Sequence, residues 1–275
     1  RCMPPELSGI VTMSDLFPGA GVPLASGKPD GPVDAVPHGL PACIPTRYRV
    51  LSYLGEGAFG VVYRAVDTDS GHEVALKVHK TTSPLEAALI KEEFRTIVGI
   101  RHPCLVRLLE LVSVDEGLCL VMDYVPGVAL RDHPLQSEAA VQDVVRQLAA
   151  AVDALHAAGV VHGDLKPDNV LVRPDGNVTL LDFGFSRTSG PGGSTAANTR
   201  GGTLTYMSPA LLFGAMHTAQ DDAFALGATI LEWVEGRLPY DVEDVMRQRT
   251  QRPPQRHALL GNASLALLRE MVSAV

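Results

Sequence analysis

The hydrophobic pattern of this chain changes once along its length, and the change limits the folds that it can adopt. From residue 47 to 124, apolar residues fall in short runs that are rich in β-branched side chains and separated by Gly and Asp turns, which indicates antiparallel strands. After Gly127 they recur at helical spacing. Strands followed by helices predict an α+β fold with two lobes and a cleft. We expect a small antiparallel-β lobe over about residues 47–121, a hinge over 122–128, and a larger, mostly helical lobe over 129–275.

Five runs of the first lobe are predicted to be strands, at residues 48–54, 61–66, 73–79, 105–114 and 118–124. One helix interrupts them. Ser83 at the N-cap, Pro84 at the first helical position and Glu86 three residues after the cap form a capping box. The helix should run to about Val98 and end at Gly99.

In the second lobe, a stripe of apolar residues predicts a helix that ends at Gly159. The stripe consists of Val141, Val144, Val145, Leu148, Val152 and Leu155. Residues 170–172 and 178–181 should pair as a small hairpin around the turn at 174–177. Residues 222–235 are apolar nearly all round, which predicts a buried helix.

The first 46 residues contain nine Pro and six Gly without a period. Such a segment cannot bury enough apolar area to offset its ordering entropy. We expect a disordered extension, which is either a flexible linker or a docking or autoregulatory arm. The chain does not begin with Met, so it is expected to be a fragment, and we expect a truncation at the C-terminal end as well.

The composition excludes several classes of partner. A net charge of -8 argues against nucleic acid. No apolar run approaches the ~18 residues that a membrane span needs. The four cysteines, among them Cys119 in an apolar run, form no C-x-x-C pair. A reducing compartment, the cytoplasm, is therefore expected, with Cys119 as a buried thiol. The pattern specifies no oligomeric state.

A short polar segment at residues 160–169, Val-Val-His-Gly-Asp-Leu-Lys-Pro-Asp-Asn, lies between apolar runs. It places Asp164, Lys166 and Asn169 at offsets of zero, two and five. These groups suit the transfer of a phosphoryl group, because a carboxylate can accept a hydroxyl proton, an ammonium can offset phosphate charge and an amide can hold a metal.

A glycine-rich run, G-x-G-x-x-G, occurs at Gly55, Gly57 and Gly60. Alone it is a weak signal, because glycines often mark plain turns. A dinucleotide-binding fingerprint would open a helix after the glycines, whereas residues 61–65 indicate a second strand here. A glycine-rich hairpin allows backbone amides to close over a triphosphate without side-chain clash.

Lys77 lies on the next predicted strand, where a lysine normally faces solvent. A carboxylate that can meet it would change that interpretation. Glu93 is the candidate, because it shares a helical stripe with Ile90 and Ile97 and should face the protein body. The alternative is a solvated helix charge. Asp182 begins an Asp-Phe-Gly tripeptide that can present a carboxylate to a divalent cation, although the tripeptide alone is common.

Along the chain the five motifs follow in the order glycine run, strand Lys, helix Glu, Asp-x-Lys-x-x-Asn and Asp-Phe-Gly. In this order and at these spacings they resemble the motifs of the eukaryotic-type serine/threonine protein kinases, including the bacterial eukaryotic-like group. The resemblance covers roughly residues 47–275. It implies a bilobal protein-kinase-like fold and an enzyme that transfers the γ-phosphate of ATP to Ser or Thr hydroxyls of a protein substrate, with ATP and Mg²⁺ as cofactors.

The resemblance also implies roles for individual residues. Lys77 would hold the α- and β-phosphates and pair with Glu93. Asp164 would accept the substrate hydroxyl proton, and Lys166 would neutralise the γ-phosphate. Thr203, in a Gly-Thr-x-x-Tyr segment, would act with Lys166 to favour Ser/Thr over Tyr substrates.

Further residues would bind the nucleotide and the metal. Asn169 and Asp182 would hold the magnesium ions. The three glycines of the hairpin would cover the phosphates. Residues around the adenine would be Val62, Ala75 and Leu171 as a sandwich, Met122 as the gatekeeper, and the hinge from Asp123 to Val125.

Two positions depart from the family pattern. Gly163 replaces an Arg that in the family often grips a phosphorylated residue of the activation segment. We therefore expect activity that does not depend strongly on phosphorylation of that segment. Ala210, in Ser-Pro-Ala, replaces the Glu of Ala-Pro-Glu and cannot form its ion pair. Asp222 still matches the buried position that anchors the catalytic loop.

Two competing functions stay open. The first is a pseudokinase, a nucleotide-binding scaffold or allosteric partner that transfers nothing. The retained Lys77, Asp164, Asn169 and Asp182 argue against it, because a scaffold does not need all four. The second is a kinase-like enzyme for a small molecule, which the intact Gly-Thr-x-x-Tyr segment disfavours.

Overall fold

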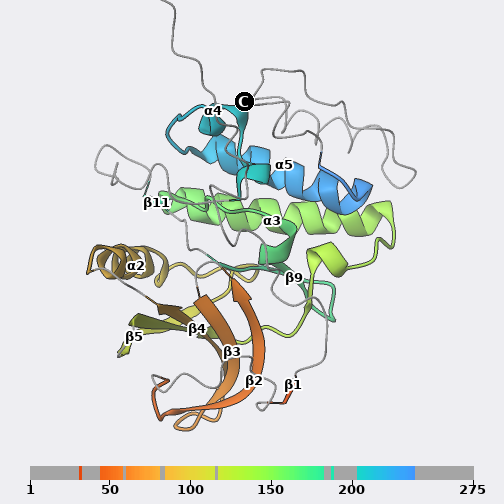
Figure 1. The fold of residues 1–275 in the computed structure, drawn as a ribbon. Helices are drawn as coiled ribbons and strands as arrows, with labels where there is room; N and C mark the ends of the chain where they lie inside the picture. The colour runs from red at the N-terminus through yellow and green to blue at the C-terminus, as the bar shows by residue number, and fades with distance from the viewer. Residues whose placement is uncertain are drawn as a thin grey trace, which may run out of the picture.

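The computed structural model describes residues 31–32, 44–57, 60–80, 84–114, 117–182, 187–188 and 203–238. Two lobes follow one another along the chain, a twisted sheet with one helix and then a helical region (Figure 1). The predicted α+β architecture is confirmed. The capping residue Ser83 and all residues after 238 lie outside the described ranges.

The sheet of the first lobe has the strand order β1-β2-β3-β4-β6-β5, and every pair in it is antiparallel. The bounds are Gly31–Pro32 for β1, Tyr48–Gly57 for β2, Gly60–Asp67 for β3, Glu73–Lys80 for β4, Leu108–Val114 for β5 and Gly117–Asp123 for β6. The helix α2, Pro84–Ile97, follows β4 and ends two residues before Gly99, close to the predicted end.

Two predictions for this lobe were wrong in part. Gly31 and Pro32, inside the segment expected to be disordered, form the edge strand β1 and pair with β2 opposite Tyr53 and Ser52. The fourth predicted strand, 105–114, begins at Leu108 instead of residue 105. Leu105 makes an isolated parallel bridge to the second lobe, so the residues before β5 connect the lobes and do not extend the sheet.

The central strand β4 is buried on both faces, from Val74 to His79, as expected for a strand with neighbours on each side. One face of the sheet packs a small apolar cluster that includes Tyr63, Leu76 and Cys119, which confirms the buried thiol. The other face, through Ala75 and its neighbours, joins the main core of the molecule.

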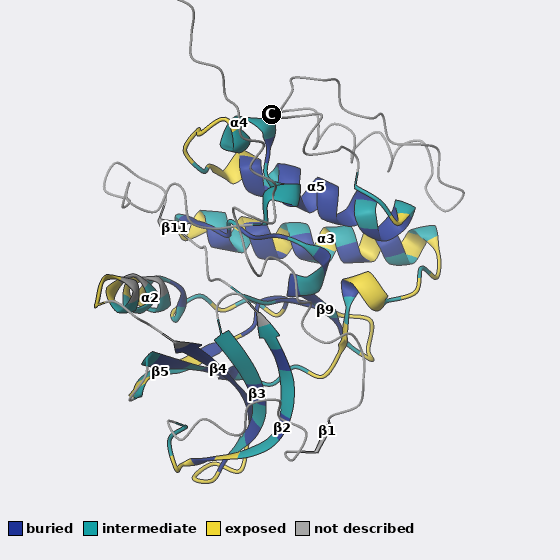
Figure 2. Ribbon diagram, viewed as in Figure 1, coloured by how far each residue is buried: buried dark blue, intermediate teal, exposed yellow. Residues whose placement is uncertain are grey.

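The second lobe is built on two long helices, α3 (Glu138–Ala157) and α5 (Ala219–Glu235). The Ser137 hydroxyl caps α3 by accepting from the Ala140 N–H at 3.2 Å, and Gly159 with φ +73° follows its end. The stripe residues of α3 are buried except Val145, which is partly exposed. Figure 2 shows α5 buried over most of its surface, as its sequence predicted.

Short elements before and between the two long helices complete the second lobe. The predicted hairpin is confirmed as β9 (Val170–Val172) and β10 (Val178–Leu180), with β7 (Val128–Ala129) on the outer side of β9. The other elements are η2 (Leu130–Asp132), β8 (Val160–Val161), η3 (Pro167–Asn169), β11 (Arg187–Thr188), η5 (Leu204–Tyr206) and α4 (Pro209–Leu212). Strand β11 pairs with β8.

Candidate active site

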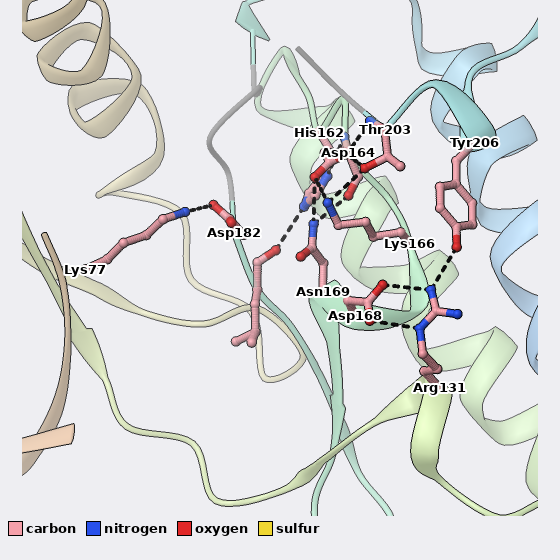
Figure 3. A network of polar contacts seen from close by, with 11 residues as sticks. Lys77, Arg131, His162, Asp164, Lys166, Asp168, Asn169, Asp182, Thr203 and Tyr206 are labelled. Carbon is pink, nitrogen blue, oxygen red and sulfur yellow. Dashed lines mark hydrogen bonds and ion pairs between the residues drawn. The ribbon is translucent and has the colours of Figure 1, made fainter. Parts of the chain in front are cut away.

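The carboxylate of Asp164 is the centre of a dense polar network in the loop between β8 and β9 (Figure 3). Its Oδ2 accepts from Lys166 Nζ at 2.7 Å and from Asn169 Nδ2 at 3.0 Å. Its Oδ1 accepts from the backbone N–H of Thr203 at 2.8 Å and from the Thr203 hydroxyl at 3.0 Å. Four donors therefore fix the orientation of a carboxylate that is almost fully buried.

Lys166 and Thr203 also contact each other. Lys166 Nζ donates to Thr203 Oγ1 at 2.9 Å as well as to Asp164. The two residues come from segments 37 positions apart. The three side chains form a closed triangle, which brings the Asp, the Lys and the Thr of the predicted catalytic set together.

Asp222, in the first turn of α5, anchors the loop. This carboxylate accepts from the backbone N–H groups of His162 at 2.8 Å and Gly163 at 3.0 Å, and from His156 Nε2 at 2.8 Å. Burial alone would raise the pKa of Asp222, but the hydrogen bonds from His156 and from the loop hold it below its ordinary value. Gly163 has φ +83°, a conformation that favours glycine.

His162 links this loop to the segment that carries Asp182. Its Nδ1 accepts from the backbone N–H of Asp164 at 3.2 Å, so the proton of a neutral ring lies on Nε2, which donates to the Leu181 carbonyl at 3.2 Å. The Leu181 N–H in turn donates to the Asn169 carbonyl at 2.7 Å. These bonds hold Asn169 and Asp182 on adjacent strands of backbone.

Lys77 on β4 and Asp182 after β10 form an ion pair across the two lobes, with Nζ and Oδ1 2.5 Å apart (Figure 3). Burial opposes ionisation of the Asp182 carboxyl, but the Lys77 charge outweighs it and lowers the pKa to about 2. Asp182 has φ +54°, the only non-glycine residue with positive φ among those that the structure describes. Backbone held in this region is costly and typical of functional sites.

The glycine-rich run forms the turn end of the β2–β3 hairpin, as predicted, with Gly55 opposite Val62 and Gly57 opposite Gly60. Gly60 has φ +134°, and a Cβ added there would lie 2.0 Å from the Val78 carbonyl oxygen. Only glycine fits here, where the first residue of β3 lies against the backbone of β4. The two residues at the tip, 58 and 59, lie outside the described ranges.

Most of the residues expected around the adenine lie in or against the core where the two lobes join. Ala75 and Met122 are directly opposite across β4 and β6, and both are buried in the main core. Val62 and Val125 pack against that core. Leu171 lies on β9, beside the hinge.

The hinge backbone itself approaches β9 closely. A Cβ added to Gly127 would lie 2.8 Å from the Val172 carbonyl oxygen and 3.3 Å from the Leu171 Cβ. Asp123, the first hinge residue, is held by a bidentate ion pair with Arg107 at 2.9 and 3.0 Å. The sequence pattern did not indicate this contact.

Several expectations fall outside the described residues. Glu93 lies in α2, but its side chain is outside them, so its pairing with Lys77 stays a prediction. The same is true of the Phe-Gly that follows Asp182 and of most of the expected activation segment.

The sequence pattern missed one cluster beside the site. Arg131 on η2 contacts Asp168 of the catalytic loop, Tyr206 on η5 and Glu232 on α5. These partners are 37, 75 and 101 residues away along the chain. No local pattern could have paired them.

The fold and the site together define a class of protein. Two lobes bring a glycine hairpin and a strand lysine against a loop that holds a buried Asp, a Lys and an Asn, with a second Asp alongside. These are the groups that position and neutralise a transferring phosphoryl group.

Comparison with known proteins agrees with this class. Residues 48–267 match the family described as "Protein kinase domain". The chain is 30% identical over 204 residues to a probable serine/threonine-protein kinase PknB of Lactococcus lactis, covering 71% of this chain and 32% of that protein. It is 33% identical over 233 residues to the serine/threonine-protein kinase ppk16 of Schizosaccharomyces pombe, covering 82% and 34%. It is 30% identical over 208 residues to the serine/threonine-protein kinase PrkC of Bacillus subtilis, covering 73% and 32%.

The chain belongs to the protein kinase family, whose members are ATP-dependent phosphotransferases. It spans about a third of the length of these curated relatives. None of the helices in the described ranges combines the length and the hydrophobicity that a bilayer crossing requires.

Proposed function

We propose that this chain transfers the γ-phosphate of ATP to Ser or Thr hydroxyls of protein substrates. The observation that carries the proposal is the Asp164 carboxylate, held by Lys166, Asn169 and Thr203 at 2.7 to 3.0 Å. A scaffold that only binds nucleotide has no need for so closely fixed a base.

The proposed chemistry starts from an exchange of partners at Asp164. The two carboxylate oxygens already accept four hydrogen bonds, which is about their full capacity. When Lys166 turns to the γ-phosphate, it vacates a position on Oδ2, and the acceptor hydroxyl takes that position. Asp164 accepts the hydroxyl proton while the hydroxyl oxygen bonds to the γ-phosphorus. The bond from phosphorus to the bridging oxygen breaks, and its electron pair leaves with ADP.

Lys77 would bind the α- and β-phosphates, which compete with Asp182 for its ammonium. Release of Asp182 from Lys77 removes the charge that lowers the pKa of this carboxyl, and a bound Mg²⁺ would supply a positive charge in its place. Val62, Ala75, Met122 and Leu171 would enclose the adenine. The glycine hairpin would cover the phosphates with backbone N–H groups.

The residues fit Mg²⁺, which prefers hard oxygen ligands. Asp182 offers a carboxylate, and Asn169 offers its amide oxygen, because its amide nitrogen already donates to Asp164 at 2.7 and 3.0 Å. Bound there, the ion would neutralise phosphate charge and orient the triphosphate. A cytoplasmic location stays a prediction.

We further propose that activity does not require a phosphate held by the loop. Gly163 has no side chain to grip one, and its backbone N–H already serves Asp222. Treatment of the purified protein with a phosphatase should change its rate less than about tenfold, since no bidentate phosphate contact is lost. A larger drop would contradict this part of the proposal.

The main test is transfer from γ-labelled ATP to a generic protein substrate, with Asp164→Asn as the control. Wild type should incorporate label, and the variant should fall by about 100-fold or more, because a general base typically contributes 10²–10⁴-fold. Equal signals from the two proteins would defeat the proposal. Nucleotide binding without transfer would favour the pseudokinase alternative.

A further inference from the structure

The Arg131 guanidinium joins three segments of the second lobe. Figure 3 shows its contacts with Asp168 and Tyr206. It donates to both oxygens of Asp168, from Nε at 2.9 Å and from Nη2 at 2.8 Å. Its Nη1 donates to Glu232 Oε1 at 2.9 Å, and its Nη2 also donates to the Tyr206 hydroxyl at 3.1 Å. The Tyr206 hydroxyl donates to the other oxygen of Glu232. One fork thus binds the catalytic loop, η5 and α5 at once.

These contacts complete a two-ended attachment of residues 203–206 to the catalytic loop. At the first end, Thr203 is bonded directly to Asp164 and Lys166. At the other end, Tyr206 is bonded through Arg131 to Asp168, four residues after Asp164. The segment between them is a single turn, closed by the bond from the Tyr206 N–H to the Thr203 carbonyl at 2.8 Å. A short turn that is fixed at both ends cannot shift relative to the base.

The charges and burial of the cluster favour a geometric role. Tyr206 is buried, and the side chains of Asp168 and Glu232 are only 17% and 16% exposed. The Asp168 contact raises the pKa of Arg131 far above its ordinary value, so the fork stays charged at every relevant pH. A lysine in its place is a point charge that cannot bond three partners in one plane.

We propose that Arg131 is a positioning residue that holds residues 203–206, and through them Thr203, against the catalytic base without any phosphate. Gly163 has no side chain that could hold this segment through a phosphorylated residue. Arg131 stabilises residues 203–206 instead. The inference rests on the proposed kinase function, because its readout is a transfer rate.

Arg131→Ala is the first variant, and Arg47→Ala is a matched control. Arg47 forms a bidentate pair with Asp67 at 2.8 and 2.7 Å and has 43% side-chain exposure, against 40% for Arg131, but it lies in the first lobe away from the site. Steady-state rates are measured with varied peptide and with varied ATP. For Arg131→Ala we expect kcat/KM for peptide to fall by about 10-fold or more, because the variant loses hydrogen bonds to charged groups. KM for ATP should stay within about 2-fold of wild type. For Arg47→Ala both should stay within about 2-fold.

Two further measurements separate positioning from folding. Hydrogen exchange should show faster exchange in residues 203–206 of Arg131→Ala, with exchange in α5 unchanged. If Arg131→Ala does not fold, Arg131→Lys keeps the charge and the stem and should still lose most of the peptide kcat/KM. In a double-mutant cycle, Tyr206→Phe should add little to Arg131→Ala, because both remove the same link.

The possible outcomes distinguish a failure of the proposed function from a failure of the proposed role of Arg131. A wild type that transfers no phosphate counts against the proposed function. An active wild type in which Arg131→Ala behaves like Arg47→Ala, or in which Arg131→Lys is fully active, overturns the role of Arg131 and leaves the proposed function standing.

Discussion

At the scale of single residues, the site is a set of buried charges that satisfy one another. Lys77 meets Asp182, Lys166 meets Asp164, and Asp222 meets backbone N–H groups and a histidine. A buried charge without a partner is expensive, so each of these pairs constrains the position of its members. Because phosphate and Mg²⁺ are themselves charged, a ligand would enter this site by exchanging partners.

The Thr203 hydroxyl is predicted to matter for rate more than for stability. It donates to Asp164 and accepts from Lys166. Thr203→Val, which has nearly the same shape, should lower kcat by about 10-fold or more, because it removes the hydrogen bonds of the hydroxyl to two charged groups. Thr203→Ser keeps the hydroxyl and should stay within a few-fold of wild type in the same peptide assay. Equal losses in both variants would show that packing, and not the hydroxyl, is what counts.

The ion pair of Lys77 predicts how stability depends on pH. The folded pKa of Asp182, about 2, is below its ordinary value of 3.8. The ionised group therefore adds stability that is complete above about pH 4 and is lost as the pH falls towards 2. In Lys77→Met the folded pKa should rise, so acid destabilisation should begin at a higher pH than in wild type.

Urea unfolding followed by Trp233 fluorescence between pH 7 and pH 3 measures this shift. Asp182→Asn serves as the control, because it removes the titrating group and should remove that part of the pH dependence. Parallel pH curves for wild type and Lys77→Met would contradict the prediction.

At the scale of elements, the sequence predicted the boundaries that neighbouring residues set. The end of α2 near Gly99, the end of α3 before Gly159 and the β9–β10 hairpin all follow from glycines and turn residues. The beginning of β5 at Leu108 did not follow, because the preceding residues are drawn into a bridge with Leu180. The two-residue strands β7, β8 and β11 were missed as well, since a run of two is too short to show a period.

The close approach of Gly60 on β3 to Val78 on β4 predicts a position in the glycine hairpin that tolerates no side chain. In Gly60→Ala, the new Cβ would lie 2.0 Å from the Val78 oxygen at a φ of +134°, so the hairpin must move away from β4. We expect a loss of about 2 kcal/mol or more in unfolding free energy and a raised KM for ATP.

Gly71→Ala is the control for this experiment. Gly71 has φ +74° in the β3–β4 turn, and nothing lies within 4 Å of its added Cβ. The substitution should cost only about 1 kcal/mol of backbone strain and leave KM for ATP unchanged. If the two variants behave alike, the close approach to Val78 has no effect on the hairpin.

At the scale of the whole molecule, one apolar core connects the lobes. Ala75, Ile97 and Met122 from the sheet lobe belong to the same buried cluster as Leu148 of α3 and Phe224 of α5. Figure 2 shows α3 and α5 lying side by side, with α5 buried over most of its surface. The lobes are therefore expected to unfold as one unit, in spite of the hinge between them.

Leu148→Ala tests this continuity. The side chain is fully buried, so its truncation should lower the unfolding free energy by about 2–5 kcal/mol. Hydrogen exchange of the slowest amides in β4 should accelerate to the same extent as that in α5. Acceleration confined to the second lobe would mean that the lobes unfold separately.

More of the candidate site could be predicted from the sequence than of the contacts that support it. Asp164, Lys166 and Asn169 lie within six positions, and the structure brings Thr203 to Asp164 and Lys166. The partners of Arg131 could not be predicted, because they meet only after three separate segments have packed. Sequence spacing identifies groups that share a loop, whereas contacts between loops depend on the completed fold.

The grip of Asp222 on the loop has a consequence for how position 163 can be substituted. Asp222 holds the peptide N–H groups of positions 162 and 163, and every residue except proline carries one. The anchor itself therefore accepts any side chain but that of proline at position 163, whereas the φ of +83° there favours glycine. A lineage that replaced this glycine would keep the hold of Asp222 on the loop and would have to absorb the strain in the backbone beside Asp164.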